Sequence, residues 1–360
     1  TVGMVAYVAY LIAVLWQSEL IDARKSKKRK AIFVFLCFVE LFLLTGLRGY
    51  DVGSDTRTYL DRFLEKKGIT FFGIFELEPK GFEYGYQIFQ NFCAFTGMNE
   101  TGYLFAVAAV IYIPFFVFVY KYSEHPEISI LVYFAFNMFY YSLGIFRQMI
   151  ALSLCLTTVP LILKRKPVSF VVVTCIAGSF HMTAFVWMVT YFLYAFINRR
   201  QIKWAILIAA VALPIGEILM KPIFELIERY HFYFDNIENY RTSPDDSFFM
   251  FFVFCSILIA TQVFGYFEKK KTPCERLSLM CLCLCVIEVS LARFFALTAR
   301  AVTYFSVYLT ITLPSWLEKC FDDKWRYYFR VTLTLALLII TITMSFYGNK
   351  HICPFVFFWQ

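Results

Sequence analysis

A polar loop near the start of the chain carries residues that could bind or activate a hydroxyl-rich ligand. It covers residues 47–59 and combines two arginines, two glycines and two carboxylates between apolar segments. The carboxylates of Asp51 and Asp55 can accept hydrogen bonds from hydroxyl groups, and Gly53 permits backbone conformations that other residues avoid. An ordinary Asx turn with solvated charges has the same composition. The loop alone therefore leaves a binding site and a plain turn as alternatives.

Arginines at the ends of apolar segments are the second set of chemically suggestive residues: Arg48, Arg147, Arg293 and Arg300. The planar guanidinium matches phosphate oxygens in pairs, so several arginines together would suit a diphosphate. An arginine beside a membrane span is costly unless it is paired, hydrated or used. Snorkelling to the interface is the alternative, which we favour for Arg57. For Arg147 and Arg293 we favour a function.

His181 lies within residues 178–183, where small and polar residues interrupt a long apolar run. It could donate a hydrogen bond, pair with a phosphate or transfer a proton, and a structural role is the alternative. The other histidines, His125, His231 and His351, show no ligand spacing, and most of the eleven cysteines lie in apolar segments. We therefore expect neither a metal site nor a disulfide framework. No phosphate-binding loop or dinucleotide fingerprint is present, so no cofactor is expected.

The elements that must position these residues are membrane helices. The chain has 360 residues, of which 60% are hydrophobic and 21% aromatic. Apolar runs long enough to cross a bilayer alternate with short charged segments. We therefore expect an all-α polytopic integral membrane protein with a single domain over residues 1–360. The net charge of +8 does not indicate nucleic-acid binding, because the basic residues cluster at the ends of the spans.

Four basic clusters set the expected orientation. They cover residues 24–30, 164–166, 199–203 and 269–271, and the positive-inside rule places all four in the cytoplasm. About twelve spans result, among them residues 128–141, 145–163 and 204–220, with both termini outside. Two outer segments, residues 47–101 and 221–247, are expected to contain interfacial helices and to cover a site. In the first, apolar residues recur near helical spacing over residues 84–95, which predicts one such helix there. The residues that this topology gathers on the outer side are Arg48, Asp51, Asp55, Glu83, Arg147, Gln148, His181, Arg293 and Arg300.

Four blocks of sequence resemble the EpsG/Wzy-like family of bacterial exopolysaccharide and O-antigen polymerases. They are residues 48–55 together with Tyr59, residues 83–86, residues 146–151 and residues 179–184. The resemblance is good over roughly the first 200 residues. Beyond them it rests on the pattern of spans and on the region of Arg293 and Arg300.

The resemblance implies a glycosyltransferase in the bacterial cytoplasmic membrane, with its active site facing outside. The enzyme would move a growing glycan from a polyprenyl diphosphate carrier onto another lipid-linked repeat unit. Its partners would be these two lipid-linked substrates, membrane lipid, and flippase and chain-length regulator proteins. No nucleic acid is involved.

Roles for the residues follow from that reaction. Arg147, Arg293 and Arg300 would stabilise the diphosphate leaving group without a metal, while Asp51 or Asp55 would orient or deprotonate the acceptor, with His181 as the competing base. The substrate-binding set is completed by a further group of residues: Arg48, Gly53, Tyr59, Glu83, Tyr86 and Gln148. Within it, Tyr59 and Tyr86 offer stacking faces for sugars.

Three other functions compete with polymerisation. A glycan flippase or transporter would carry its charged residues along a central pathway, whereas here they lie towards one side. An outer-face ligase would use the same chemistry and differ only in its acceptor. A membrane acyltransferase would use a histidine, which His181 alone supports weakly.

Overall fold

The computed structural model describes residues 2–79, 81–194, 244–292, 296–347 and 355–359. In these ranges every regular element is a helix, as the sequence predicts, and one isolated antiparallel bridge joins Arg48 to Phe357. Two backbone hydrogen bonds flank that bridge, from Gly49 N to the Val356 carbonyl (2.6 Å) and from Phe358 N to the Leu47 carbonyl (3.0 Å). Residues 356–358, about 300 positions further along the chain, therefore hold one side of the polar loop in place.

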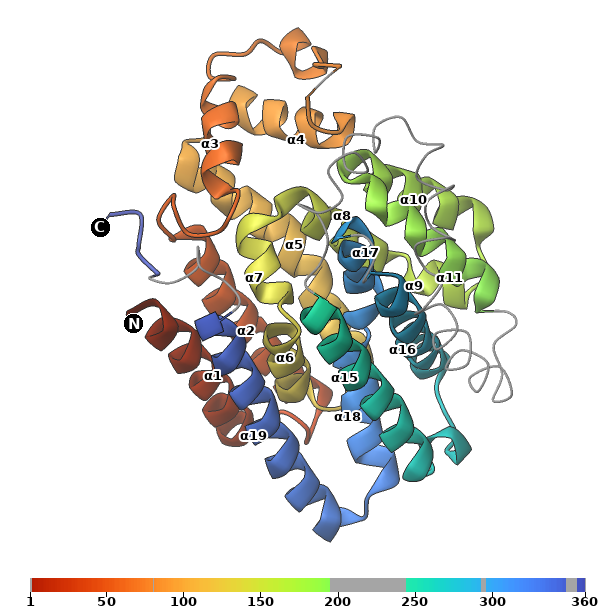
Figure 1. Ribbon diagram of the computed structural model, residues 1–360. Helices are drawn as coiled ribbons and strands as arrows, with labels where there is room; N and C mark the ends of the chain where they lie inside the picture. The colour runs from red at the N-terminus through yellow and green to blue at the C-terminus, as the bar shows by residue number, and fades with distance from the viewer. Residues whose placement is uncertain (1, 80, 195–243, 293–295, 348–354, 360) are drawn as a thin grey trace.

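Most helices run along one common direction and form a bundle (Figure 1). The long helices are α1 (Val2–Ile21), α2 (Lys27–Gly46), α5 (Glu100–Tyr122), α15 (Pro244–Val263), α16 (Pro273–Ala292) and α19 (Asp323–Tyr347). The shorter ones are α6 (Pro126–Ala135), α7 (Met138–Gly144), α8 (Phe146–Thr157), α9 (Val159–Leu163), α10 (Pro167–Phe180), η2 (Met182–Trp187), α11 (Met188–Leu193), η4 (Tyr266–Glu268), α17 (Ala296–Ser306) and α18 (Leu309–Cys320). Side-chain oxygens cap the first turns of some helices. At the start of α5, Oδ1 of Asn99 accepts a hydrogen bond from Gly102 N (2.8 Å).

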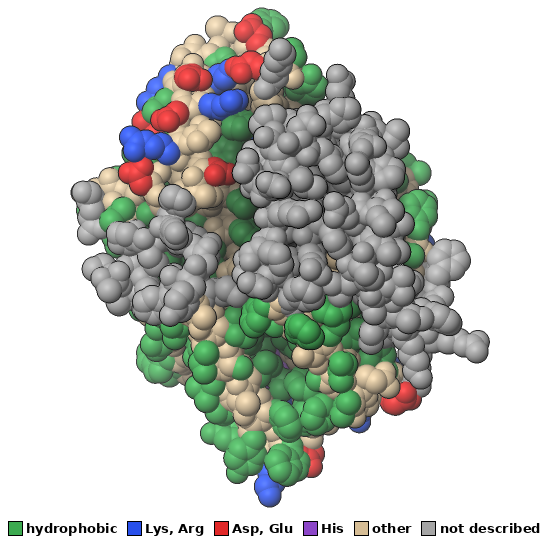
Figure 2. All heavy atoms as spheres, viewed as in Figure 1, with side chains coloured by type: hydrophobic (Ala, Val, Ile, Leu, Met, Phe, Trp, Pro, Cys, Tyr) green, Lys and Arg blue, Asp and Glu red, His purple; other side chains and the backbone are tan. Residues whose placement is uncertain are grey.

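Three helical segments are long and apolar enough to cross a membrane: Glu100–Tyr122, Phe146–Leu163 and Asp323–Thr343. Five shorter apolar helices accompany them in the described residues. Figure 2 shows charged side chains over the upper end and a largely hydrophobic flank beneath them. A membrane protein needs such a flank, because lipid cannot hydrate charged groups. The expected total of about twelve spans is not established by these helices. The expected span over residues 204–220, and residues 221–243 of the expected outer segment 221–247, lie outside the described residues.

One expected single span, residues 128–141, is a broken helix, whereas residues 145–163 keep one segment long enough to cross the membrane with a local irregularity at Thr158. Residues 128–141 were expected as one span, but Asn137 has a left-handed backbone (φ 61°) and separates α6 from α7. Residues 145–163 contain Pro160, and α8 ends at Thr157 before α9 begins at Val159. Proline lacks the amide hydrogen that a continuous helix needs. The interruption expected at residues 178–183 is present, where α10 ends at Phe180 and η2 begins at Met182.

A small layer, which we call the cap, covers one end of the bundle. It consists of α3 (Thr56–Leu64), η1 (Phe72–Phe75) and α4 (Tyr84–Phe95). Helix α4 buries amides, with Asn91 donating to the Ile74 carbonyl (3.2 Å) and Gln90 to the Tyr59 carbonyl (3.0 Å). It exposes aromatic rings, among them Phe92 and Phe95. This inverted amphipathic pattern fits a layer whose outer surface contacts lipid rather than water.

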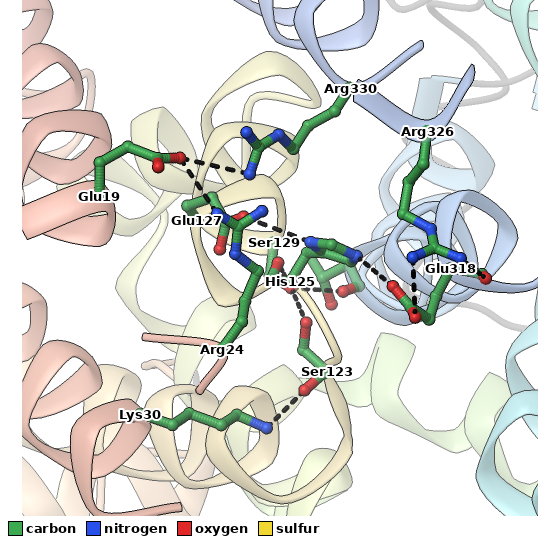
Figure 3. Close-up of polar contacts among 11 residues, drawn as sticks. Glu19, Arg24, Lys30, Ser123, His125, Glu127, Ser129, Glu318, Arg326 and Arg330 are labelled. Carbon is green, nitrogen blue, oxygen red and sulfur yellow. Dashed lines mark hydrogen bonds and ion pairs between the residues drawn. The ribbon is translucent and has the colours of Figure 1, made fainter. Parts of the chain in front are cut away.

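The opposite end of the bundle contains the basic cluster of residues 24–30, and we call it the basic end. It carries a network of polar contacts around a buried histidine (Figure 3). His125 lies between Glu127 (Nδ1 to Oε1, 3.4 Å) and Glu318 (Nε2 to Oε2, 3.1 Å), and Arg326 binds Glu318 in turn (3.4 Å). Burial lowers the pKa of His125, but the contacts with both carboxylates raise it more, so the net shift is upward. The network therefore joins the start of α6 to the end of α18.

Candidate functional site

Three helix ends meet beneath the cap and bring polar side chains together. Glu83 is the residue before α4, Arg147 is in the first turn of α8, and His181 joins α10 to η2. Helix α10 packs against both α4 and α8, which fixes the relative positions of these ends. We call Glu83, Arg147 and His181 the polar cluster.

Glu83 is the centre of the polar cluster. Its Oε2 accepts a hydrogen bond from Arg147 Nη1, and its Oε1 lies 3.3 Å from Nδ1 of His181. Burial raises the pKa of the Glu83 carboxyl, but the hydrogen bond with His181 and the charge of Arg147 lower it more, to about 2. Glu83 is therefore a carboxylate at neutral pH, and it orients both of its neighbours.

His181 is mostly buried, with 13% of its side chain exposed. Burial lowers its pKa more than the contact with Glu83 raises it, so the net pKa lies below the usual value for histidine. The ring is then neutral at pH 7. With the proton on Nδ1, directed at Glu83, the lone pair on Nε2 can accept a proton from a ligand. A carboxylate that orients a neutral imidazole in this way is an arrangement suited to general base catalysis.

Arg147 is held by an aromatic pair as well as by Glu83. Its Nε donates to the Tyr59 hydroxyl (3.3 Å), and its Cζ lies 4.5 Å from the centre of the Phe82 ring. The Tyr59 ring itself stacks on Phe146, with 4.7 Å between centroids. Nη2 of Arg147 has no hydrogen bond to any described residue, and 22% of the side chain is exposed. That nitrogen is available to an anionic ligand.

Arg300 contributes charge to the same region from α17. Its side chain is exposed, and its positive charge is one of the causes that lower the pKa of His181. Its carbonyl accepts a hydrogen bond from Nε2 of Gln148 (2.8 Å), which also donates to Thr303 Oγ1 (2.8 Å). Gln148 is buried and therefore ties α8 to α17 rather than facing a ligand. Arg293 lies outside the described residues.

Arg48 has a structural position instead of an open one. It is fully buried and donates to the carbonyls of Thr45, Val52 (3.3 Å) and Leu143 (3.2 Å), and its Cζ lies 5.3 Å from the Phe146 ring centre. All three of its nitrogens are thus used within the protein. Arg48 therefore fixes the polar loop to the end of α7, and its burial leaves it without access to a substrate in this structure.

The two carboxylates of the polar loop, Asp51 and Asp55, make neither a hydrogen bond nor an ion pair with the polar cluster. Asp51 forms an exposed ion pair with Arg57 (2.9 Å), whose partners are 72% and 74% exposed. Asp55 is exposed at the start of α3 and makes no capping hydrogen bond with its side chain. Tyr86, expected as a sugar-stacking face, is fully buried and bonds to the Tyr103 hydroxyl. Tyr59 is buried also, so it positions Arg147 rather than stacking on a sugar.

Gly53 is required by the geometry of the loop. Its φ is +107°, and a Cβ placed on it would lie 2.1 Å from the carbonyl oxygen of Leu143. Gly68 also has a positive φ, +81°, but a Cβ there would meet nothing within 4 Å. Comparing alanine substitutions at the two glycines therefore separates the cost of a positive φ from the cost of a clash between the added Cβ and neighbouring atoms.

We expect Gly53→Ala to destabilise the protein by about 3 kcal/mol or more, because strain and a clash with backbone add together. Gly68→Ala should cost about 1 to 2 kcal/mol, from the left-handed conformation alone. Thermal unfolding of both purified variants in the same detergent measures the difference. Equal losses would mean that the loop at Gly53 moves away from Leu143 at little cost.

Two features of the cluster carried no sequence signal. Phe82 packs on Arg147 although nothing in its spacing marks it, and Gly85 touches Ser179 so closely that a Cβ would lie 2.1 Å from the Ser179 Oγ. Phe82 borders the block of residues 83–86 that the sequence had already singled out, and Gly85 lies inside that block, but the two contacts themselves leave no trace in the sequence. Among the described residues, no group of three or more His, Cys, Asp or Glu side chains could hold a metal ion.

Comparison with known proteins yields one match. The model of the EpsG family matches residues 30–357, which is most of the chain. No curated protein and no solved structure matches the chain.

Proposed function

Because the chain belongs to the EpsG family, we propose that it is a membrane glycosyltransferase that joins lipid-linked oligosaccharide units into a polysaccharide. The donor would be a glycan on polyprenyl diphosphate, and the acceptor a second lipid-linked unit. The observation that carries this proposal is the polar cluster, in which one carboxylate orients both a neutral histidine and an arginine at the end of a membrane bundle.

The chemistry that this geometry supports is a single displacement at the anomeric carbon. Nε2 of His181 accepts the proton of the acceptor hydroxyl as the oxygen attacks C1 of the donor sugar. The bond between C1 and the diphosphate oxygen breaks, and the diphosphate leaves with the bonding electrons. Arg147, through Nη2, and Arg300 stabilise the charge that develops there. Glu83 stays ionised and holds both side chains in place.

The distribution of charge supports an orientation in the membrane. We propose that the basic end faces the cytoplasm of a bacterium and the cap faces outside, with about twelve spans forming a single membrane domain. Ser54 at the cap and Lys28 at the basic end are both exposed. A membrane-impermeant thiol reagent applied to intact cells should label a cysteine placed at Ser54 and spare one placed at Lys28. Labelling in the reverse pattern would overturn the orientation.

The glycan length distribution in cells that lack the protein tests the function itself. Loss of a polymerase should leave single repeat units on the carrier at the outer leaflet. Full-length polymer trapped on the carrier would mean that the protein is a ligase. Units confined to the cytoplasmic leaflet would mean that it is a flippase. Restoring the wild-type protein should return long polymer, whereas a His181→Gln variant should not.

A further inference from the structure

An apolar groove of about 480 Å³ lies between the cap and α10. We call it the aromatic groove. One side comes from η1 with Phe75, the floor from α4 with Phe92 and Phe95, and the other side from α10 with Ile176. These four side chains are between 43% and 61% exposed. Several large exposed apolar side chains in one place mark a surface that another apolar group covers.

The aromatic groove ends beside the polar cluster. Gly85 and Ser179 are part of its lining, and their close contact is where α4 crosses α10. Glu83 lies two residues before Gly85, and His181 lies two residues after Ser179. A molecule with an apolar chain and a polar head could therefore place the chain in the groove and the head at the cluster.

We propose that the aromatic groove holds the isoprenoid chain of the lipid-linked donor while its diphosphate lies at Arg147. This proposal rests on the proposed function, because it takes the donor to be polyprenyl-linked. An apolar cavity of about 150 Å³ holds one benzene molecule, so this groove has room for roughly three six-carbon portions of a chain. The chain would run from the polar cluster along the cap and into the bilayer.

A second apolar groove, between α2 and α5, serves as a contrast. It has a volume of about 260 Å³ and is lined by residues such as Phe35 and Phe116. Its lining contains no charged side chain, and it belongs to the parts of α2 and α5 that lie towards the basic end. Lipid tails in the bilayer are sufficient to cover such a surface. The aromatic groove differs because its end adjoins a group able to bind phosphate.

Kinetics with donors of two chain lengths test the proposal. The donors carry the same glycan diphosphate on either a long polyprenyl chain or a two-isoprene chain, and the full-length protein is held in lipid nanodiscs. Phe75→Ala together with Phe92→Ala should raise KM for the long-chain donor about tenfold. Both kcat and the KM of the short-chain donor should stay unchanged. Phe72→Ala is the matched control, because Phe72 lies in the same η1 turn, is 79% exposed and does not line the groove. An equal rise in KM for the Phe72 variant, or for both donors, would overturn the proposal.

Photolabelling of the wild-type protein separates this inference from the function on which it rests. The probe is a polyprenyl diphosphate without glycan, with a diazirine in its chain, and it should label η1, α4 and α10 in a manner that unlabelled polyprenyl diphosphate displaces. Labelling in the groove without any glycan transfer would refute the proposed function and keep the site. Transfer with labelling elsewhere would refute the site alone. A diazirine phospholipid that labels the groove equally and resists displacement would show a plain lipid-facing surface, which also refutes it.

Discussion

Replacing His181 with glutamine should lower turnover by about 10²- to 10⁴-fold, which is the range that a general base contributes. Glutamine keeps a nitrogen donor for Glu83 but has no group that can take up a proton at neutral pH. The wild-type rate should rise with pH until His181 is neutral and then level off. Because the pKa of His181 lies below its usual value, that rise should be complete before neutral pH. The glutamine variant should lack this rise.

The competing candidates for the base are tested in the same assay, with purified protein and lipid-linked substrates. Asp51→Asn and Asp55→Asn each remove a carboxylate while preserving its size. A loss of two orders of magnitude in either variant, with His181→Gln close to wild type, would return the base to the polar loop. Thermal unfolding of all three variants distinguishes lost chemistry from lost structure.

Replacing Arg147 with lysine should reduce kcat about a hundredfold while leaving the yield of folded protein close to normal. Lysine keeps the positive charge but cannot contact Glu83 and Tyr59 at once while presenting a third nitrogen to a phosphate. Removal of one preorganised donor to a developing negative charge costs a factor of this size. The quantity to measure is kcat at saturating donor, together with the thermal unfolding midpoint.

Arg57→Lys is the matched control for that experiment. This substitution replaces a guanidinium with an ammonium group, just as at Arg147. The ion pair of Arg57 with Asp51 is exposed, however, and exposed pairs contribute little. Its turnover should remain within about twofold of wild type. If the two lysine variants lose activity equally, Arg147 has no special part in stabilising the leaving group.

Some features of the site could be predicted from the sequence, because the residues concerned lie at the ends of apolar segments. Glu83, Arg147 and His181 each stand where a helix begins or ends, so the topology placed them on one side of the membrane, but it placed Asp51 and Asp55 there too and did not single out these three as neighbours. Their contact agrees with that expectation, while their catalytic roles remain predictions. The apolar spacing in residues 84–95 also predicted a helix, and α4 covers that range.

Other features depend on contacts that no local pattern records. Arg48 looked like the other arginines, but one of its partners is the carbonyl of Leu143, 95 residues away. His125 showed no ligand spacing because its partner Glu318 is 193 residues away. The hydrophobic pattern of α4 located its apolar face but did not say that the buried face would include amides bonded to the backbone of the cap. Sequence spacing indicates the face on which a residue lies, and tertiary packing decides what meets it.

The bridge between Arg48 and Phe357 has a consequence for the order in which the protein matures. Ribosomes add about 5–20 residues per second, so Phe357 is made roughly 15 to 60 seconds after Arg48, about 300 residues later. Through that interval the amide of Gly49 and the carbonyl of Leu47 await partners that have not been synthesised. A nascent chain halted before Val356 would contain every described helix, while its polar loop would still lack these two hydrogen bonds. Residues 355–359 therefore complete the polar loop only after all the helices that precede them have been synthesised.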